Sequence, residues 1–291
     1  MIDINTLAMV GGALAIGFSP IISKAMKLSP TTIGFYRFFI GFIFLSIIIL
    51  IKKPKIDSKS LKKMIIPCMT GGFFFSCDLW LWHRSILYIG AGISTLLANT
   101  QVLYLVLIGI IFFKERPKWY FFIALLLTGA GVVMATSSFA SLDFDSLHMK
   151  GLIYGLLTGL SYSFVTLSLK KANDQYHHPG PWPIFLLTFF ASIFSLVFVV
   201  LENEMHLPQG IDILYAVIYG GLIHACGWLL ISKAIKVIPI ALASLILLLQ
   251  PIFATILGVM IYNEQISILQ ALGLALSLIG IYIAMNSREK K

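Results

Sequence analysis

One carboxylate lies inside a stretch of aromatic and aliphatic residues. Asp78 belongs to the segment GGFFFSCDLWLWHRSILYIGAG, which runs from Gly71 to Gly92. An unpaired charge surrounded by hydrocarbon costs on the order of a few kcal/mol, so Asp78 is expected to face water or to have a partner. Trp82 lies four residues further on and shares the same helical face. A carboxylate beside an indole can hold a cation.

A basic residue, Arg37, is expected at a depth similar to that of Asp78, one helix earlier in the chain. Three interpretations stay open. The two residues can form a structural ion pair, Asp78 can be a protonatable coupling group, or Asp78 can be the counter-charge for a substrate amine.

Uncharged polar residues form a second group of candidates. Gln101 and Gln250 each lie near the middle of an expected helix, and can offer amide donors and acceptors from opposite sides of one cavity. Alternatively, each can form an interhelical hydrogen bond that only holds its bundle together. Asn99 adds polarity beside Gln101, and Tyr162 and His224 are further candidates. A histidine titrates near physiological pH, although a lone buried one can serve only as a hydrogen-bonding partner.

Metal, cofactor and nucleophilic chemistry find no support in the sequence. His177 and His178 are adjacent on an expected loop, without further ligands at metal-binding spacing. The chain contains no P-loop, no glycine-rich dinucleotide loop, no HExxH and no nucleophile elbow. We therefore expect no metal, no cofactor and no catalytic residue. Three cysteines in apolar stretches are expected to be small packing residues: Cys68, Cys77 and Cys226.

The elements that must position these residues are membrane helices. Hydrophobic residues make up 59% of the 291 residues and charged residues 11%, against roughly 45–50% and 25% in soluble domains. A bilayer accepts this much apolar surface when helices satisfy every backbone polar group. Stretches long enough to span a membrane predict ten helices, at about 5–25, 31–51, 63–88, 92–113, 117–136, 150–170, 183–201, 212–235, 239–262 and 266–285. The first is expected to be a retained helix rather than a signal peptide.

The net charge of +9 is distributed over alternate connections, which argues against a nucleic-acid partner. The positive-inside rule then places both termini in the cytoplasm. The basic residues on that side are Lys52, Lys53, Lys55, Lys59, Lys62, Lys63, Lys114, Arg116, Lys118, Lys170, Lys171, Lys233, Lys236, Arg288, Lys290 and Lys291. Trp80, His83 and Arg84 are expected in a belt at the outer interface. Glu115 and Glu264 are expected to complement the dipoles of the helices that follow them.

The chain repeats itself. An offset of 149 residues aligns Thr70–Thr136 with Tyr219–Met285 without a gap, and an offset of 143 pairs Gly12 with Gly155 and Lys27 with Lys170. Five helices in each half, an odd number, predict two inverted repeats, at 1–140 and 141–291. Residues identical at the offset of 149 include Gly71/Gly220, Gly72/Gly221, Cys77/Cys226, Ile86/Ile235, Ile89/Ile238, Gln101/Gln250 and Glu115/Glu264. Small residues form one predicted packing stripe per half: Ala124, Thr128, Gly131 and Ala135, matched by Gly273, Ser277, Gly280 and Ala284.

The paired segments starting RSILYIGAGISTLLANTQ and KAIKVIPIALASLILLLQ resemble helices 3–5 and 8–10 of the EamA-type transporters in the drug/metabolite transporter superfamily. The resemblance implies a ten-helix carrier whose central cavity is lined by helices 1, 3, 4, 6, 8 and 9, and which exports small metabolites from a bacterial cell. The second half departs from the family pattern, because its helix 7 has Pro183 but no intramembrane arginine equivalent to Arg37.

We therefore expect an all-α integral membrane protein of the bacterial inner membrane, a secondary carrier rather than an enzyme. Amino acids or their derivatives are the favoured substrates, protons are a candidate coupling ion, and the oligomeric state is a monomer or a homodimer. The alternative is an intramembrane enzyme or a lipid-handling, flippase-like protein, because either can also bury Asp78 and His224.

Overall fold

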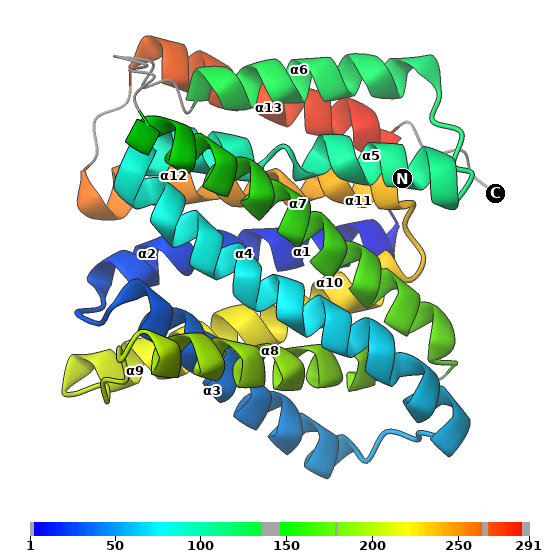
Figure 1. Cartoon of the computed structure of the whole chain (residues 1–291). Coiled ribbons are helices and arrows are strands. Elements are labelled where there is room, and N and C mark those ends of the chain that lie inside the picture. Colours follow the sequence, from blue (N-terminus) through cyan, green and yellow to red (C-terminus); the bar gives the residue numbers. More distant parts are fainter. Residues whose placement is uncertain (1–2, 136–145, 178–179, 264–266, 287–291) are drawn as a thin grey trace.

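The computed structural model describes residues 3–135, 146–177, 180–263 and 267–286. The regular secondary structure of the described chain is entirely helical, without a strand (Figure 1). Its elements are α1 (Ile4–Gly17), α2 (Ser19–Ala25), α3 (Pro30–Lys52), α4 (Ser58–Ala98), α5 (Gln101–Phe112), α6 (Trp119–Ala135), α7 (Ser146–Gln175), α8 (Trp182–Leu201), α9 (Ile211–Val217), the π-helical segment η1 (Ile218–Cys226), α10 (Gly227–Ile235), α11 (Ile240–Leu247), α12 (Leu249–Tyr262) and α13 (Ile268–Asn286).

Eight helices, or helices joined end to end, are long and apolar enough to cross a membrane. They are α1 with α2, α3, α4 as far as Ile89, α7, α8, α9 through α10, α11 with α12, and α13. The apolar helices α5 and α6 are shorter. The all-helical membrane fold is thus confirmed, with eight long spans and two shorter apolar helices in the described chain.

Several connections gather at one end of the helical bundle. The start of α1 and the end of α13 lie there (Figure 1). The connection from α3 to α4, the turn from α5 to α6, the end of α7 and the turn from α10 to α11 lie at the same end. The end defined by these segments is called the terminal end below, and the opposite end is called the distal end.

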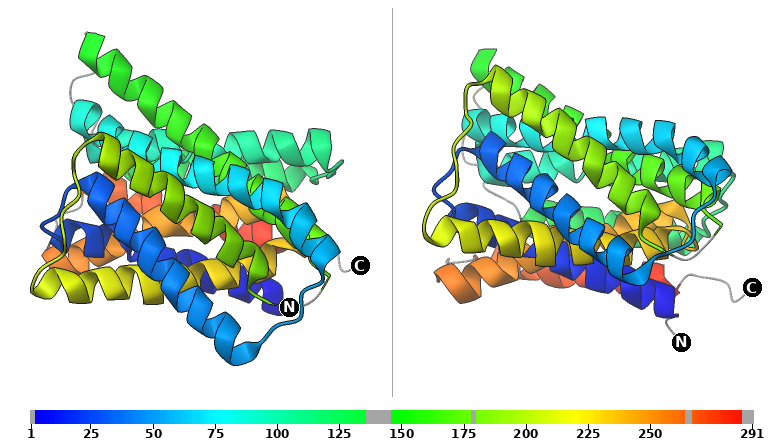
Figure 2. Two further views of the ribbon diagram at one scale, coloured as in Figure 1. Left: turned by 60° about the horizontal axis from the view of Figure 1, so that its bottom comes forward. Right: turned by 90° about the horizontal axis from the view of Figure 1, so that it is seen from below.

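The helices pack in pairs that combine the two halves of the chain. The long helices α4 and α7 run side by side, α1 packs on α10, and α3 packs on α8 and η1 (Figure 2). The pair of α6 and α13 forms one flank of the bundle. Small residues make this flank possible, because a Cβ at Gly131 would overlap Ser277 and one at Gly280 would overlap Thr128. The predicted role of these stripes in internal packing is confirmed.

Three helices are interrupted inside the bundle. The break at Phe18 precedes Pro20, and the break at Leu248 precedes Pro251. Proline has no N–H to donate to the preceding turn, which accounts for both. The break at Asn99 and Thr100 has no proline; there the Thr100 hydroxyl donates to the Leu97 carbonyl at 2.6 Å.

One predicted boundary is wrong. The sequence predicts separate helices at 63–88 and 92–113, whereas α4 continues to Ala98. The close approach of α7 supplies a physical reason for the later break. A Cβ at Gly159 would lie 2.5 Å from the Thr100 hydroxyl and 2.9 Å from the Leu97 carbonyl, so α7 packs directly on this turn.

The predicted partner of Glu115 is also wrong. Its carboxylate accepts hydrogen bonds from the backbone N–H groups of Ile240 at 2.6 Å and Ala241 at 3.1 Å. Glu115 thus complements the N-terminus of α11 in the other half of the chain, rather than that of α6. Glu264 lies outside the described residues.

At the start of α4, hydrogen bonds from the hydroxyl and the N–H of Ser60 hold the pKa of Asp57 below its ordinary value.

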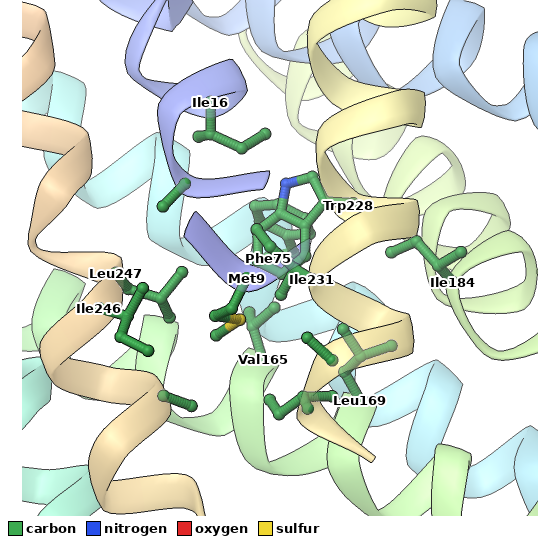
Figure 3. Packing of buried hydrophobic residues seen from close by; sticks show 14 of the residues in the cluster. Met9, Ile16, Phe75, Val165, Leu169, Ile184, Trp228, Ile231, Ile246 and Leu247 are labelled. Atoms are coloured by element: carbon green, nitrogen blue, oxygen red, sulfur yellow. The ribbon is translucent and has the colours of Figure 1, made fainter. Parts of the chain in front are cut away.

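The centre of the bundle is packed around Trp228. Its indole lies against the ring of Phe75, with ring centroids 4.9 Å apart, and both side chains are almost fully buried (Figure 3). Met9 and Ile231 lie close by in the same cluster. This apolar centre joins α1, α4 and α10, and the polar candidates surround it.

Candidate functional site

Arg37 is buried inside the bundle, in the first half of α3, with 5% of its surface exposed. Its Nε donates to His224 Nδ1 at 3.4 Å, and its Nη1 donates to the Tyr219 hydroxyl at 3.1 Å. The guanidinium also lies 5.0 Å from the centre of the Tyr219 ring and 5.6 Å from that of Phe75, within the range of cation–π attraction. These contacts of the Arg37 guanidinium are with neutral groups and aromatic rings.

His224 is positioned by η1, which packs on α3. Its Nε2 lies 3.1 Å from the Thr188 hydroxyl, so the imidazole bridges Arg37 on α3 and Thr188 on α8. Gly41 makes room for the ring, because a Cβ there would lie 2.6 Å from His224 Cδ2. Short π-helical segments occur frequently at functional sites, and here η1 carries the imidazole.

Asp78 is buried in α4, with 6% of its surface exposed. Its carboxylate forms no hydrogen bond and no ion pair within 4.0 Å with any described residue. Arg37 is close enough for the two charges to interact through the protein interior, but the structural ion pair left open by the sequence is absent. A buried carboxylate without a partner is an exception among native structures and points to a role for its charge.

Tyr162 lies at the same level of the bundle as Asp78. A Cβ at Gly155 of α7 would lie 3.0 Å from the Ser85 hydroxyl of α4. The two helices run antiparallel, so moving seven residues along each from this contact leads to Tyr162 on α7 and Asp78 on α4.

Both predicted glutamines contact α7. The Gln250 amide donates to the Tyr162 hydroxyl at 3.0 Å, and the adjacent Ser163 hydroxyl lies 3.3 Å from the Gln101 backbone carbonyl. The side chain of Gln101 is buried, and its Oε1 has no hydrogen-bond partner. The side chain of Gln250 therefore meets Tyr162, whereas Gln101 meets the next residue of α7 through its main chain.

Several other buried polar atoms lack a partner in the described chain. They are Trp228 Nε1, Asn99 Nδ2, His83 Nδ1 and Ser19 Oγ. Trp228 lies between the two parts of the site, with its ring 6.1 Å from that of Tyr162 and 6.4 Å from that of His224. Unpaired buried donors and acceptors of this kind fit bound water or a polar ligand.

The remaining candidate, Trp82, is half-buried and contacts the ring of His83 at 5.2 Å. Its indole forms no hydrogen bond with Asp78 in the described chain, although both residues share a helical face. Sequence reasoning missed Tyr219 and Thr188, the partners of Arg37 and His224. Their hydroxyls are ordinary in sequence, and only the packing of α3, α8 and η1 identifies them.

A separate polar cluster lies at the distal end, around Glu202. Its carboxylate accepts hydrogen bonds from Thr31 at 2.7 Å and from the Trp80 indole at 2.8 Å, and it pairs with Arg84. The cluster joins α3 and α4 to the end of α8. Within the described residues, no group of three or more His, Cys, Asp or Glu side chains is arranged to hold a metal ion.

Comparison with known proteins shows similarity to membrane transporters. The EamA-like transporter family matches residues 4–137 and 149–286. An uncharacterised transporter of Clostridium kluyveri is 23% identical over 245 residues, which cover 82% of this chain and 77% of that protein. The uncharacterised transporter YxxF of Bacillus subtilis is 22% identical over 287 residues, which cover 98% of this chain and 90% of that protein.

A solved crystal structure superimposes with a TM-score of 0.81 at 16% sequence identity, covering 98% of this chain and 99% of that one, and so shares its fold. The family match extends over both halves of a chain with many membrane-spanning helices. This chain is therefore a multi-pass membrane protein that belongs to the EamA-like transporter family.

Proposed function

We propose that the chain is a secondary active transporter in which two inverted five-helix repeats, residues 1–140 and 141–291, enclose a central substrate site. Reciprocal packing supports this arrangement. Helix α1 packs on α10, and its repeat equivalent α7 packs on the equivalent of α10, which is α4. The glycines follow the same rule: a Cβ at Gly72 would lie 2.6 Å from Phe190 of α8, and one at its equivalent Gly221 would lie 2.5 Å from Phe44 of α3.

The observation that carries the proposal is the unpaired Asp78 carboxylate, buried beside an arginine that is bonded to neutral groups. Because Asp78 and Arg37 do not pair with each other, they suit a ligand that carries one positive and one negative charge. A zwitterionic amino acid, or a derivative with a free amine, would place its ammonium against Asp78. Its carboxylate would approach Arg37, while Tyr162 and Gln250 would provide polar contacts.

Coupling to protons follows from the same carboxylate. If Asp78 must lose a proton before it binds the substrate amine, substrate and proton compete for one group. Alternating exposure of that group to the two sides then exchanges substrate for protons. In a cell with an inward proton gradient this exchange drives export.

The membrane orientation is part of the proposal. Basic residues occur in the connection from α3 to α4, in the turns from α5 to α6 and from α10 to α11, and at the end of α7, and these segments lie at the terminal end. Their position supports a cytoplasmic location of this end in a bacterial inner membrane. A reporter that is active only in the cytoplasm, fused after residue 291, is expected to be active, and an outer location of the C-terminus would contradict this orientation. The protein is expected to act as a monomer or a homodimer.

Reconstituted vesicles test the function. Purified protein in liposomes is offered a panel of labelled amino acids, amino-acid amides and fatty acylated amines. Uptake of an unmodified amino acid, competed by the unlabelled compound and absent from empty liposomes, supports the carrier. Chemical conversion without uptake would instead indicate an intramembrane enzyme, and movement of the acylated probes alone would indicate a lipid-handling protein.

A further inference from the structure

Lys170 is a buried lysine at the terminal end of the bundle, outside the site described above. Its exposed fraction is 8%, and its Nζ donates to the carbonyl oxygens of Ile235 at 3.0 Å and Ile238 at 3.3 Å. These carbonyls belong to the last turn of α10 and to the segment directly after it. The ammonium therefore binds the negative end of a helix dipole and satisfies carbonyls that the helix itself leaves free.

Lys170 also connects this contact to other helices. Its Nζ lies 5.4 Å from the centre of the Phe113 ring, at the end of α5. One turn further along α7, Asn173 Nδ2 donates to Ser232 of α10 at 3.0 Å. At the terminal end, Lys170 and Asn173 thus join α7 to α10 beside α5.

The internal repeat gives Lys170 an equivalent, Lys27, in the first half of the chain. Lys27 lies at the distal end, between α2 and α3, and its side chain is exposed. Its ammonium forms no hydrogen bond or ion pair with the described residues, and only its backbone N–H is engaged, with Asp212 at 3.3 Å. The same residue type therefore occurs in two states, bound at one end of the bundle and unbound at the other.

The carbonyls that would receive Lys27 also have equivalents. Ile86 and Ile89 occupy the repeat positions of Ile235 and Ile238. In this structure they lie inside the continuous helix α4, where carbonyls are used by the helix. Their equivalents are available because α10 ends at Ile235. The two halves therefore differ at this position of the repeat. The second half has a helix end at Ile235, which a lysine can cap, whereas the equivalent Ile86 lies inside a continuous helix.

We propose that Lys170 and Lys27 are alternating latches of the transporter, an inference that rests on the proposed inverted-repeat transport cycle. Lys170 caps α10 and stabilises closure of the terminal end in the state described here. In the opposite state α4 ends near Ile89, as the glycine-rich sequence after it allows, and Lys27 caps the freed carbonyls while Lys170 is released. The lysines thus set the equilibrium between the two states without touching the substrate.

Side-specific labelling tests the latches. The three native cysteines are replaced (Cys68→Ala, Cys77→Ser and Cys226→Ser), Gln250→Cys provides one thiol in the central site, and an impermeant maleimide is applied to right-side-out and inside-out vesicles. Lys170→Met removes the ammonium but keeps an apolar stem. It is expected to raise the ratio of terminal-side to distal-side labelling by about tenfold or more, because one state loses a charge-assisted hydrogen bond. Lys27→Met is expected to lower that ratio, and the double variant is expected to lie near the parent.

Matched controls separate a latch from a loss of charge. Lys171 and Lys150 are exposed lysines at the two ends, and Lys171→Met and Lys150→Met should leave the ratio unchanged. Thermal unfolding in detergent shows whether each variant is folded. A Lys170→Met ratio equal to that of Lys171→Met, or a shift in the same direction for both latch variants, would overturn the proposal. If the unmodified chain transports substrate, such a result removes the latches alone. If the folded Gln250→Cys protein with both lysines intact is labelled from neither side, the proposed central aqueous site and the latches both fail.

Discussion

Arg37 Nε lies 3.4 Å from His224 Nδ1, and this contact, rather than an ion pair with Asp78, satisfies part of the buried guanidinium. A direct ion pair would neutralise both charges before any ligand arrived. With Arg37 held by His224 and Tyr219, the Asp78 carboxylate stays available at the same level as Tyr162. The imidazole therefore positions the arginine, and the carboxylate remains for the ligand.

Replacement of the imidazole tests this role. His224→Leu removes the acceptor of a buried charged donor and is expected to lower the free energy of unfolding by about 1–3 kcal/mol. His224→Asn keeps an acceptor near the position of Nδ1 and should recover part of the loss. Thermal unfolding of the purified variants in detergent measures both effects. Equal stability of His224→Leu and the parent would show that Arg37 does not depend on this contact.

The hydrogen bond between Gln250 and Tyr162 is expected to act as a unit in substrate binding. Gln250→Leu and Tyr162→Phe each remove one partner of the 3.0 Å contact and should each raise the KM for uptake. Because the interaction is shared, the double variant should be little worse than either single variant. Initial uptake rates in liposomes measure the effect, and fully additive losses would mean that the two residues act independently.

Close packing of α6 against α13 predicts a position-specific loss of stability. Gly131→Val places side-chain atoms where Ser277 and the Gly273 carbonyl already lie, and is expected to cost about 1–3 kcal/mol. Gly129→Val is the matched control, because no atom lies within 4 Å of a Cβ there. Thermal unfolding of both variants provides the comparison. Similar melting temperatures for the two would contradict the packing described for this flank.

The contact of Glu115 with α11 predicts coupling between the halves of the chain. Glu115→Ala leaves the N–H groups of Ile240 and Ala241 without their carboxylate acceptor, with an expected loss of about 1–2 kcal/mol. Glu115→Gln retains an acceptor oxygen and should lose less. Protease cleavage of the connection between α10 and α11 in detergent reports on local opening. Unchanged cleavage in Glu115→Ala would show that this cap does not hold the two halves together.

Helix positions could be read from the sequence because the bilayer demands long apolar stretches. The helices α3 and α8 begin within one residue of the predicted positions 31 and 183. Interruptions inside these stretches were harder to predict. Pro20 and Pro251 account for two of them, but the break at Thr100 depends on the approach of Gly159 from α7, which local sequence does not encode.

The candidate site could be predicted in residue type but only partly in contacts. Hydropathy identified Asp78, Arg37 and His224 as buried polar groups, and the structure buries all three. Which side chains meet depends on the rotation of each helix about its axis. That rotation turns Arg37 toward His224 and Tyr219, and it turns Gln250 toward Tyr162. The internal repeat singled out Gln101 and Gln250 as a pair, and their place on opposite sides of one cavity stays a prediction, whereas nothing in the repeat indicated the partners of Arg37.

Proton-driven uptake by Asp78→Asn tests the central claim most directly. Liposomes with an acidic lumen are offered a labelled amino acid that the parent transports, and initial uptake is compared with and without the pH gradient. Glu204→Gln, which changes a carboxylate in the loop after α8, is the control. We predict that the gradient accelerates uptake by the parent and by the control, and that Asp78→Asn loses this acceleration while remaining folded. An equally strong response to the gradient in Asp78→Asn would contradict the account.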